Sequence, residues 1–101
     1  VGEATQSSLS GFRMIRNGTI VGASIENNNT LTTARNVEIR INNSTINKVT
    51  LSVLTGTTGT SINNANLDFS VNNIIQVVAV ASSVGAALDN TIVVIDIAYR
   101  I

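Results

Sequence analysis

The sequence predicts an all-β fold, an antiparallel and jelly-roll-like β-sandwich of about seven to eight strands. Runs rich in Val, Ile and Thr recur at intervals of roughly 8–12 residues, which is the spacing typical of sandwiches and barrels. Short polar residues, mainly Asn, Gly, Ser and Thr, separate these runs as turn residues do. No stretch carries a long helical period. A chain of 101 residues is large enough for one such domain to bury its own core.

The domain is expected to span residues 11–101. Residues 1–10 are small and polar, and we interpret them as a linker or a weak edge strand. Because the sequence begins at Val1 rather than Met, processing or a longer parent chain is expected. Nothing at the front resembles a signal peptide.

The first strands are expected at residues 11–16 and 19–26. Asn17-Gly18 between them is the strongest hairpin signal in the chain, because both residues tolerate positive φ. Within the second strand, Gly22 indicates a bulge or a close backbone approach.

Residues 35–42 form the clearest amphipathic strand, in which alternate positions are apolar and polar. Val37, Ile39 and Ile41 are expected to face inward, and Asn36, Glu38, Arg40 and Asn42 outward. Asn42-Asn43 then turns the chain, and residues 49–53 continue the sheet. The Gly/Thr-rich stretch 55–61 is expected to be an exposed loop, before another strand at 67–71.

The last quarter of the chain contains two runs dense in Val and Ile, residues 73–82 and 91–101, joined by a loop in which 84–88 could form one helical turn. We expect the runs to be neighbouring central strands. Both are apolar on both parities, which indicates that their second face is also covered. We interpret that face as an interface between copies of the chain, with an apolar centre and a charged rim. Its candidate residues are Ile74, Val78, Val80, Ile92, Val94, Asp96 and Arg100.

Composition argues against chemistry at a catalytic site. The chain has no His and no Cys, so the usual general base and the commonest zinc ligands are missing. The carboxylates do not sit at the short spacing of a calcium loop or a local glycosidase pair. We therefore expect no enzyme activity, no metal and no cofactor. A net charge of zero without basic clusters argues against nucleic acid and anionic membranes, and no apolar run reaches the ~18 residues of a membrane span.

Glu38 and Arg40 are one strand step apart on a polar face. Either they are a solvated pair that contributes under ~1 kcal/mol, or they pair between subunits. The sequence leaves both interpretations open.

Two segments give the chain a family resemblance. Gly11-Phe-Arg-Met-Ile-Arg-Asn-Gly-Thr-Ile-Val-Gly-Ala-Ser-Ile25 and Ala34-Arg-Asn-Val-Glu-Ile-Arg-Ile-Asn42 resemble small β-sandwich domains on the virions of tailed bacteriophages: capsid decoration proteins, head fibres and tail-fibre tips. The resemblance implies a structural or attachment role on the virion surface, commonly as a homotrimer. Asn42-Asn43 departs from the Asn-Gly that is more typical at that turn, and aromatic residues are scarcer than usual.

Three functions therefore compete. The first is a non-catalytic virion surface module that self-associates through its terminal strands, with other virion proteins or a host receptor as further partners. The second is a receptor- or carbohydrate-binding module that uses the loops 27–33 and 55–63. The third is the trimerisation head of a bacterial surface filament.

Overall fold

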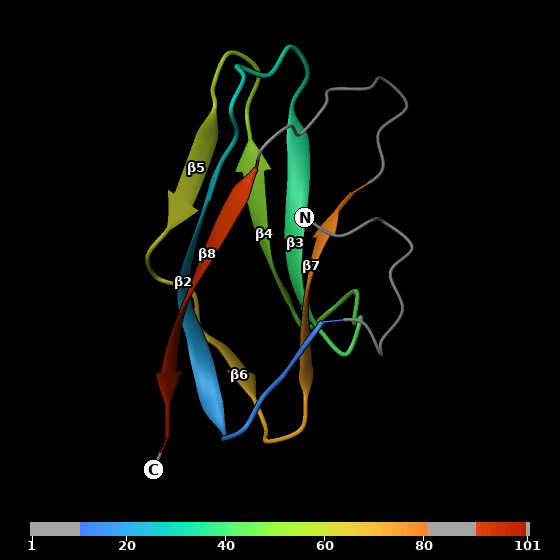
Figure 1. Cartoon of the computed structure of the whole chain (residues 1–101), viewed down its shortest axis with the longest axis vertical. Helices are drawn as coiled ribbons and strands as arrows, with labels where there is room; N and C mark the ends of the chain where they lie inside the picture. The colour runs from blue at the N-terminus through green and yellow to red at the C-terminus, as the bar shows by residue number, and fades with distance from the viewer. Residues whose placement is uncertain (1–10, 81–90, 101) are drawn as a thin grey trace.

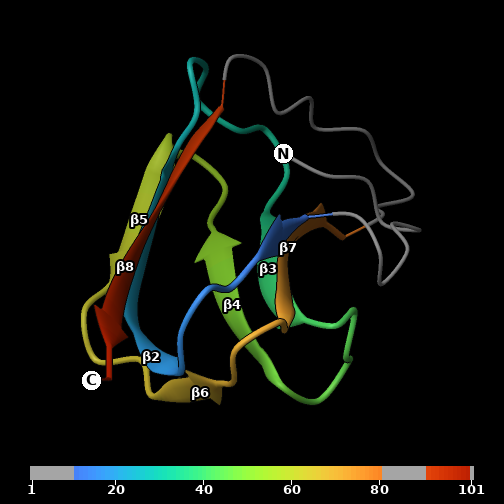
Figure 2. The ribbon, with the colours of Figure 1, turned by 60° about the horizontal axis from the view of Figure 1, so that its bottom comes forward.

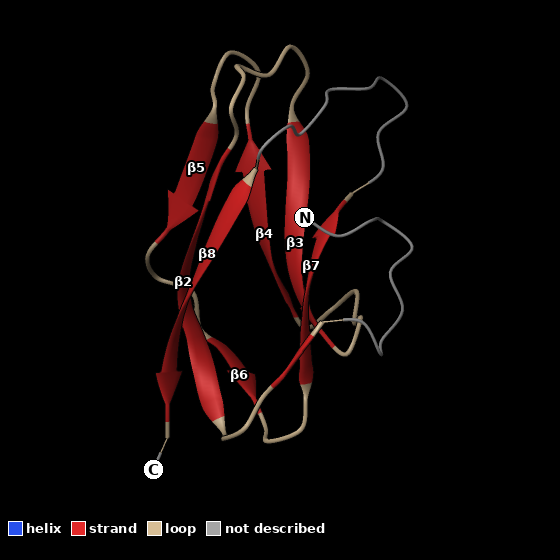
Figure 3. Ribbon diagram, viewed as in Figure 1, coloured by secondary structure: helices blue, strands red, loops and turns tan. Residues whose placement is uncertain are grey.

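The computed structural model describes residues 11–80 and 91–100, and it shows two antiparallel sheets packed face to face (Figures 1 and 3). Within these residues the strands are β1 (Phe12–Arg13), β2 (Gly18–Glu26), β3 (Arg35–Ile41), β4 (Lys48–Val53), β5 (Gly59–Ile62), β6 (Leu67–Phe69), β7 (Ile74–Ala79) and β8 (Ile92–Tyr99). The antiparallel β-sandwich is thereby confirmed. This strand pairing does not establish the jelly-roll order that we expected.

Sheet A has the strand order β1-β7-β3-β4. Its centre is the pairing of β3 with β4 and β7, and all of its pairs are antiparallel. The turn after β3 is the one that the sequence predicts: Asn42 and Asn43 have φ of 51° and 56°, and the Ser44 N–H donates to the Ile41 carbonyl at 3.0 Å. Two successive residues with positive φ are what a type I′ turn requires.

Sheet B is organised around β2. One edge of β2 pairs with β8 along almost its whole length, and the other pairs with β6 at Gly18–Ile20 and with β5 at Ala23–Glu26. Among the described residues, β8 is therefore an edge strand whose second edge meets no other strand.

A bulge in β2 confirms the prediction at Gly22. Ile20 pairs with Ile97 and Gly22 with Asp96, so β2 advances two residues while β8 advances one. The extra residue shifts the alternation, so that Ile20 and Ala23 both face the interior although three positions separate them.

The core between the sheets is almost entirely aliphatic. Ile20, Val37, Ile39, Leu51 and Val53 have no exposed surface. Phe69 closes one end of this core and meets the ring of Tyr99 edge-on, with the ring centroids 6.2 Å apart. The partly buried Val93, Ile95 and Ile97 of β8 pack against the same cluster, as the parity of that strand predicts.

Several local predictions are wrong. Asn17-Gly18 does not form a hairpin, because β1 pairs with β7 in sheet A and the chain then crosses to sheet B (Figure 2). Only Phe12–Arg13 of the expected first strand is a strand. The stretch 55–61 is not all loop, because Gly59–Ile62 pairs with β2 as strand β5. The expected linker 1–10 and the helical turn at 84–88 lie outside the described residues.

Candidate functional site

The two terminal runs, which we expected to be neighbouring central strands, lie in different sheets. β7 belongs to sheet A, where it pairs with β1 and β3. β8 belongs to sheet B, where it is an edge strand on β2. The expected continuous face over both strands therefore does not form. The candidate residues of β7 and those of β8 lie on different sheets and have different neighbours.

On β7, the candidate interface residues Ile74 and Val78 are buried within the single chain. Ile74 is 7% exposed and Val78 is 0% exposed. Both lie on the parity opposite Ile75 and Val77, which face the core between the sheets, so they lie on the outer face of sheet A. Val78 therefore has no surface, and Ile74 very little, with which to contact another copy. Val80 is half-buried, and its N–H donates to the Asn36 carbonyl at 3.0 Å.

A buried ion-pair network surrounds this part of sheet A. Glu38, which pairs with Val78 across the strands, is 7% exposed. One carboxylate oxygen of Glu38 accepts a hydrogen bond from Arg40 Nε at 2.8 Å, and the other accepts one from Lys48 Nζ at 2.6 Å. Neither sequence interpretation of the Glu38–Arg40 pair fits, because the pair is inside one chain and largely shielded from solvent.

The network continues to β7 through the turn after β3. Arg40 Nη1 donates to Asn43 Oδ1 at 3.0 Å, and the Asn43 N–H donates to Gln76 Oε1 at 2.9 Å. Gln76 is only 1% exposed. A buried amide needs such partners, since an unsatisfied polar group in the interior is destabilising. The buried side chains of Glu38 and Gln76 on the outer face of sheet A thus have hydrogen-bond partners within their own chain.

The charge of Glu38 is stabilised by this arrangement. Burial raises the pKa of the Glu38 carboxyl group, but the hydrogen bonds from Lys48 and Arg40 and the positive charges of these side chains outweigh it. The pKa of Glu38 therefore lies below its ordinary value of 4.5.

The outer face of sheet B is different, because its apolar side chains are open to solvent. On β8, Ile92 is 67% exposed and Val94 is 58% exposed. Ile92 pairs with Glu26 of β2, and Val94 pairs with Ser24. These two apolar residues remain candidates for an interface, and they lie on an edge strand that contains one charged residue, Asp96, and no proline. Such edges are prone to pair with other chains.

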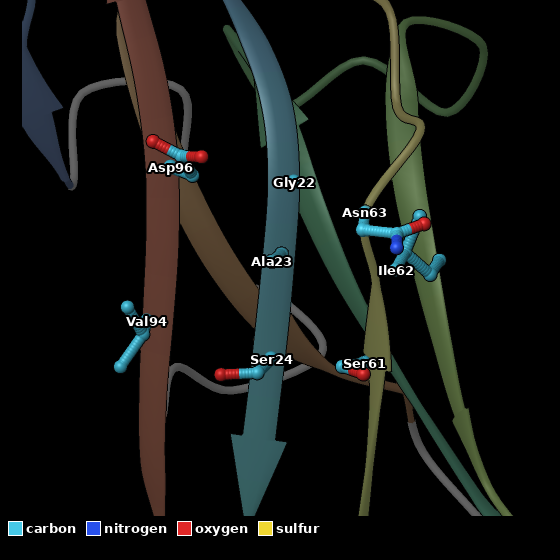
Figure 4. A pocket seen from close by; sticks show the side chains of 8 residues that line it. All are labelled: Gly22, Ala23, Ser24, Ser61, Ile62, Asn63, Val94 and Asp96. Atoms are coloured by element: carbon cyan, nitrogen blue, oxygen red, sulfur yellow. The ribbon is translucent and has the colours of Figure 1, made fainter.

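A shallow groove of about 240 Å³ runs beside Val94 on this face (Figure 4). Its lining comes from β8, β2, β5 and the residue after β5: Gly22, Ala23, Ser24, Ser61, Ile62, Asn63, Val94 and Asp96. The bulge contributes to the hollow, because Gly22 has no side chain to fill it. A Cβ at this position would lie 2.9 Å from the Ile62 carbonyl oxygen, so only glycine fits without a shift.

Asp96 and Arg100, expected as one charged rim, have separate roles. Arg100 Nη2 contacts Asp68 Oδ1 at 2.5 Å and Thr19 Oγ1 at 2.9 Å, and so links β8 to β6 across β2. Asp96 lies on the groove instead and forms no ion pair with the described residues. The partner of Arg100 was missed because Asp68 is distant in sequence, and only the pairing of β2 with both strands brings the two together.

The arrangement offers little for catalysis. Ser24 and Ser61 line the groove, but the chain contains no His to activate a hydroxyl. Within residues 11–80 and 91–100, no three acidic side chains gather as a metal site would need. In the same residues, no helix is long and apolar enough to span a bilayer.

The two loops of the alternative binding hypothesis lie together at one end of the sandwich (Figure 1). The Leu31 N–H donates to the Thr57 carbonyl at 2.9 Å, and the Gly56 N–H donates to the Leu31 carbonyl at 2.9 Å. Asn27 is not available as a binding residue: it is 3% exposed, and its side chain bonds the Asn29 carbonyl and the Thr91 hydroxyl.

Comparison of the chain with protein-family models, with curated proteins and with solved structures gives no match.

Proposed function

We propose that this chain is a non-catalytic structural module that associates with copies of itself through the outer face of sheet B. The observation that carries the proposal is the exposure of Ile92 and Val94, which lie on the same face of an edge strand. Neighbouring exposed aliphatic side chains on a strand are a feature of interaction surfaces. The bacteriophage-like segments of the sequence support a virion surface as the setting, with a homotrimer as the assembly.

Two exposed side chains do not suffice for stable association. Complete burial of one Val or Ile contributes roughly 1.5–3 kcal/mol, whereas the loss of free motion on association costs an estimated 4–15 kcal/mol. Burial of the five apolar interface positions expected from sequence would exceed the lower part of that range, but Ile74 and Val78 are already buried within the chain. The partner surface must therefore contribute apolar and charged groups of its own.

The test is the mass of the chain in solution, measured by size-exclusion chromatography with light scattering. At micromolar concentration we expect a mass above the 10.6 kDa of one chain. Val94→Asp places a charge on the exposed face and should reduce the mass to that of one chain, with an unchanged β-sheet circular dichroism spectrum.

Ile46→Asp is the matched control. Ile46 is 86% exposed and follows β3, away from the outer face of sheet B, so its substitution should leave the assembly intact. A wild-type chain that stays at the mass of one chain from micromolar to hundreds of micromolar would contradict the proposal.

Binding of a receptor or glycan is the second candidate function. The hydrogen bonds that join the loops near Leu31 and Thr57 favour it, because they create one composite surface at one end of the sandwich. A glycan array and a cell-adsorption assay separate this candidate from the first, since a purely structural module should bind to neither.

A further inference from the structure

The charged side chains that lack an ion-pair partner are not spread evenly over the described surface. Of the carboxylates in the described residues, Glu38 and Asp68 form ion pairs. Glu26 and Asp96 form none with that part of the chain, and both are exposed. Glu26 pairs with Ile92, and Asp96 lies two residues after Val94. We call Glu26, Ile92, Val94 and Asp96 the acidic face.

A second surface combines exposed apolar groups with the opposite charge. Phe12 is 71% exposed and Ile15 is 74% exposed. Arg13 and Arg16, next to them in sequence, are also exposed, and neither forms an ion pair with a described residue. Arg13 Nη1 donates a hydrogen bond of 3.3 Å to the Asn72 carbonyl. We call Phe12, Arg13, Ile15 and Arg16 the basic segment.

We propose that the acidic face of one copy is occupied by the basic segment of the next copy. This inference rests on the proposed self-association and names the surface that fills the exposed face. The acidic face and the basic segment each contribute two exposed apolar side chains. Each also contributes two charged side chains that form no ion pair within the described residues, and the two pairs of charges have opposite sign. Two acidic faces placed against each other would instead bring like charges together.

The groove gives this contact a fixed position. It is open beside Val94 and is bordered by Asp96 and the hydroxyl groups of Ser24 and Ser61 (Figure 4). An apolar side chain of the basic segment packs on Val94 at this hollow. Ile15 and Arg16 are both exposed in the bend that follows β1, and in the proposed contact the guanidinium group of Arg16 pairs with the carboxylate of Asp96.

The proposed contact is head-to-tail, because its two halves are different parts of the molecule. β1 lies at the edge of sheet A, and the chain after it crosses the side of the sandwich towards β2, whereas the acidic face is the outer surface of sheet B (Figure 2). A contact between unlike surfaces builds a closed ring when the rotation closes and a filament when it does not. A closed ring of three copies would be a trimer in which every contact is the same and no two-fold axis is needed.

Mixing two variants tests this arrangement. Val94→Asp damages the acidic face and leaves the basic segment intact, and Ile15→Asp does the reverse. Each variant alone should have the mass of one chain in sedimentation velocity, and an equimolar mixture should give the mass of two chains and nothing larger. Both new side chains are negative, so the damaged surfaces cannot form a substitute contact.

The outcomes separate this inference from the proposed function. If Val94→Asp is monomeric and Ile15→Asp assembles like the wild type, self-association stands and the proposed contact is wrong, because the acidic face then meets a surface other than the basic segment. If the wild type is itself monomeric, both fail. If the mixture of two monomeric variants does not form a complex, the inference is also overturned.

Charge reversal provides an independent test on the same chain. Arg16→Glu and Asp96→Lys should each weaken association by about tenfold or more, because each places like charges opposite one another. The double variant should recover most of the lost affinity. Like the wild type, it should associate more weakly at high salt, because salt screens the restored pair of opposite charges. Independent, additive losses in the double variant would contradict the proposed pairing of Arg16 with Asp96.

Discussion

On the outer face of sheet A, Gln76 and Val78 of β7 are buried, whereas on the outer face of sheet B, Ile92 and Val94 of β8 are more than half exposed. The surrounding charges differ in the same way. Glu38 is held by two cations of its own chain, while Asp96 has no ion-pair partner in the described residues. The buried charge of sheet A is thus compensated within the chain, whereas the exposed apolar residues of sheet B lie beside a carboxylate that has no ion-pair partner among the described residues.

The largest expected difference between the two faces is in the free energy of unfolding when a valine on each face is replaced by aspartate. Val78→Asp should lower the free energy of unfolding by more than about 3 kcal/mol, because it places an unpaired charge where no surface is accessible. Val94→Asp should change the stability of the single chain by under about 0.5 kcal/mol, since its side chain is exposed. Urea denaturation followed by circular dichroism at several protein concentrations separates this effect from loss of assembly. Equal effects of the two variants would remove the distinction between the faces.

Removing the central charge of the sheet A network should have the next largest effect. Glu38→Gln keeps the shape but leaves Arg40 and Lys48 without their anion, which should destabilise the fold by about 1.5–3 kcal/mol at pH 7. The same denaturation experiment measures it.

The effect should depend on pH with a defined sign. Because the pKa of Glu38 is lowered in the folded state, its stabilisation is complete above the ordinary pKa of 4.5 that the group has in the unfolded chain. It is lost as the pH falls through the lower folded-state pKa. The difference between wild type and Glu38→Gln should therefore shrink in acid. A difference that grows below pH 4 would show that the charge of Glu38 is not the stabilising feature.

The bulge in sheet B gives a smaller expected effect. Gly22→Ala should destabilise the fold by about 1–3 kcal/mol, the usual range for an overpacked site, because the new Cβ meets a backbone carbonyl. Ser24→Ala, two residues further along the same strand, is the control and should be nearly neutral. Chemical denaturation of both variants checks this, and a neutral Gly22→Ala would mean that the bulge relaxes freely.

The smallest effect is expected at the exposed ion pair of sheet B. The side chains of Asp68 and Arg100 are 66% and 53% exposed, and such pairs contribute about 0–1 kcal/mol. Asp68→Asn should therefore change the unfolding midpoint much less than Glu38→Gln does. A loss as large as that of Glu38→Gln would indicate that solvent does not screen the pair.

The sequence was sufficient for the fold class because alternation in residues 37–41 and 49–53 marks the core directly. It was insufficient where a segment's surroundings decide its state. Strand β5 is made of Gly, Thr, Ser and a single Ile, so only its pairing with β2 makes it a strand. Asn17-Gly18 has the residues of a hairpin, but β1 finds its partner in β7.

The candidate interface also could not be predicted from the sequence, because it depends on the surroundings of each strand. Val78 and Val94 occupy similar apolar runs, and periodicity alone treats them alike. They differ in their neighbours, which are far away in sequence: Glu38 lies opposite Val78, and Ser24 lies opposite Val94. Alternation predicts which side chains share a face, and it carries no information about what lies against that face.

The pairing of β2 with β8 also determines the order in which strands can pair while the chain is being synthesised. β3 and β4 adjoin in sequence and can pair as soon as both have emerged, whereas β2 waits for its longest partner until nearly all of the described chain has been made. Until then one edge of β2 has no strand to pair with, and long-range pairings of this kind form slowly. We therefore expect nascent chains that do not yet include Ile92–Tyr99 to be sensitive to protease, and expect protection of β2 to appear only once β8 can pair with it.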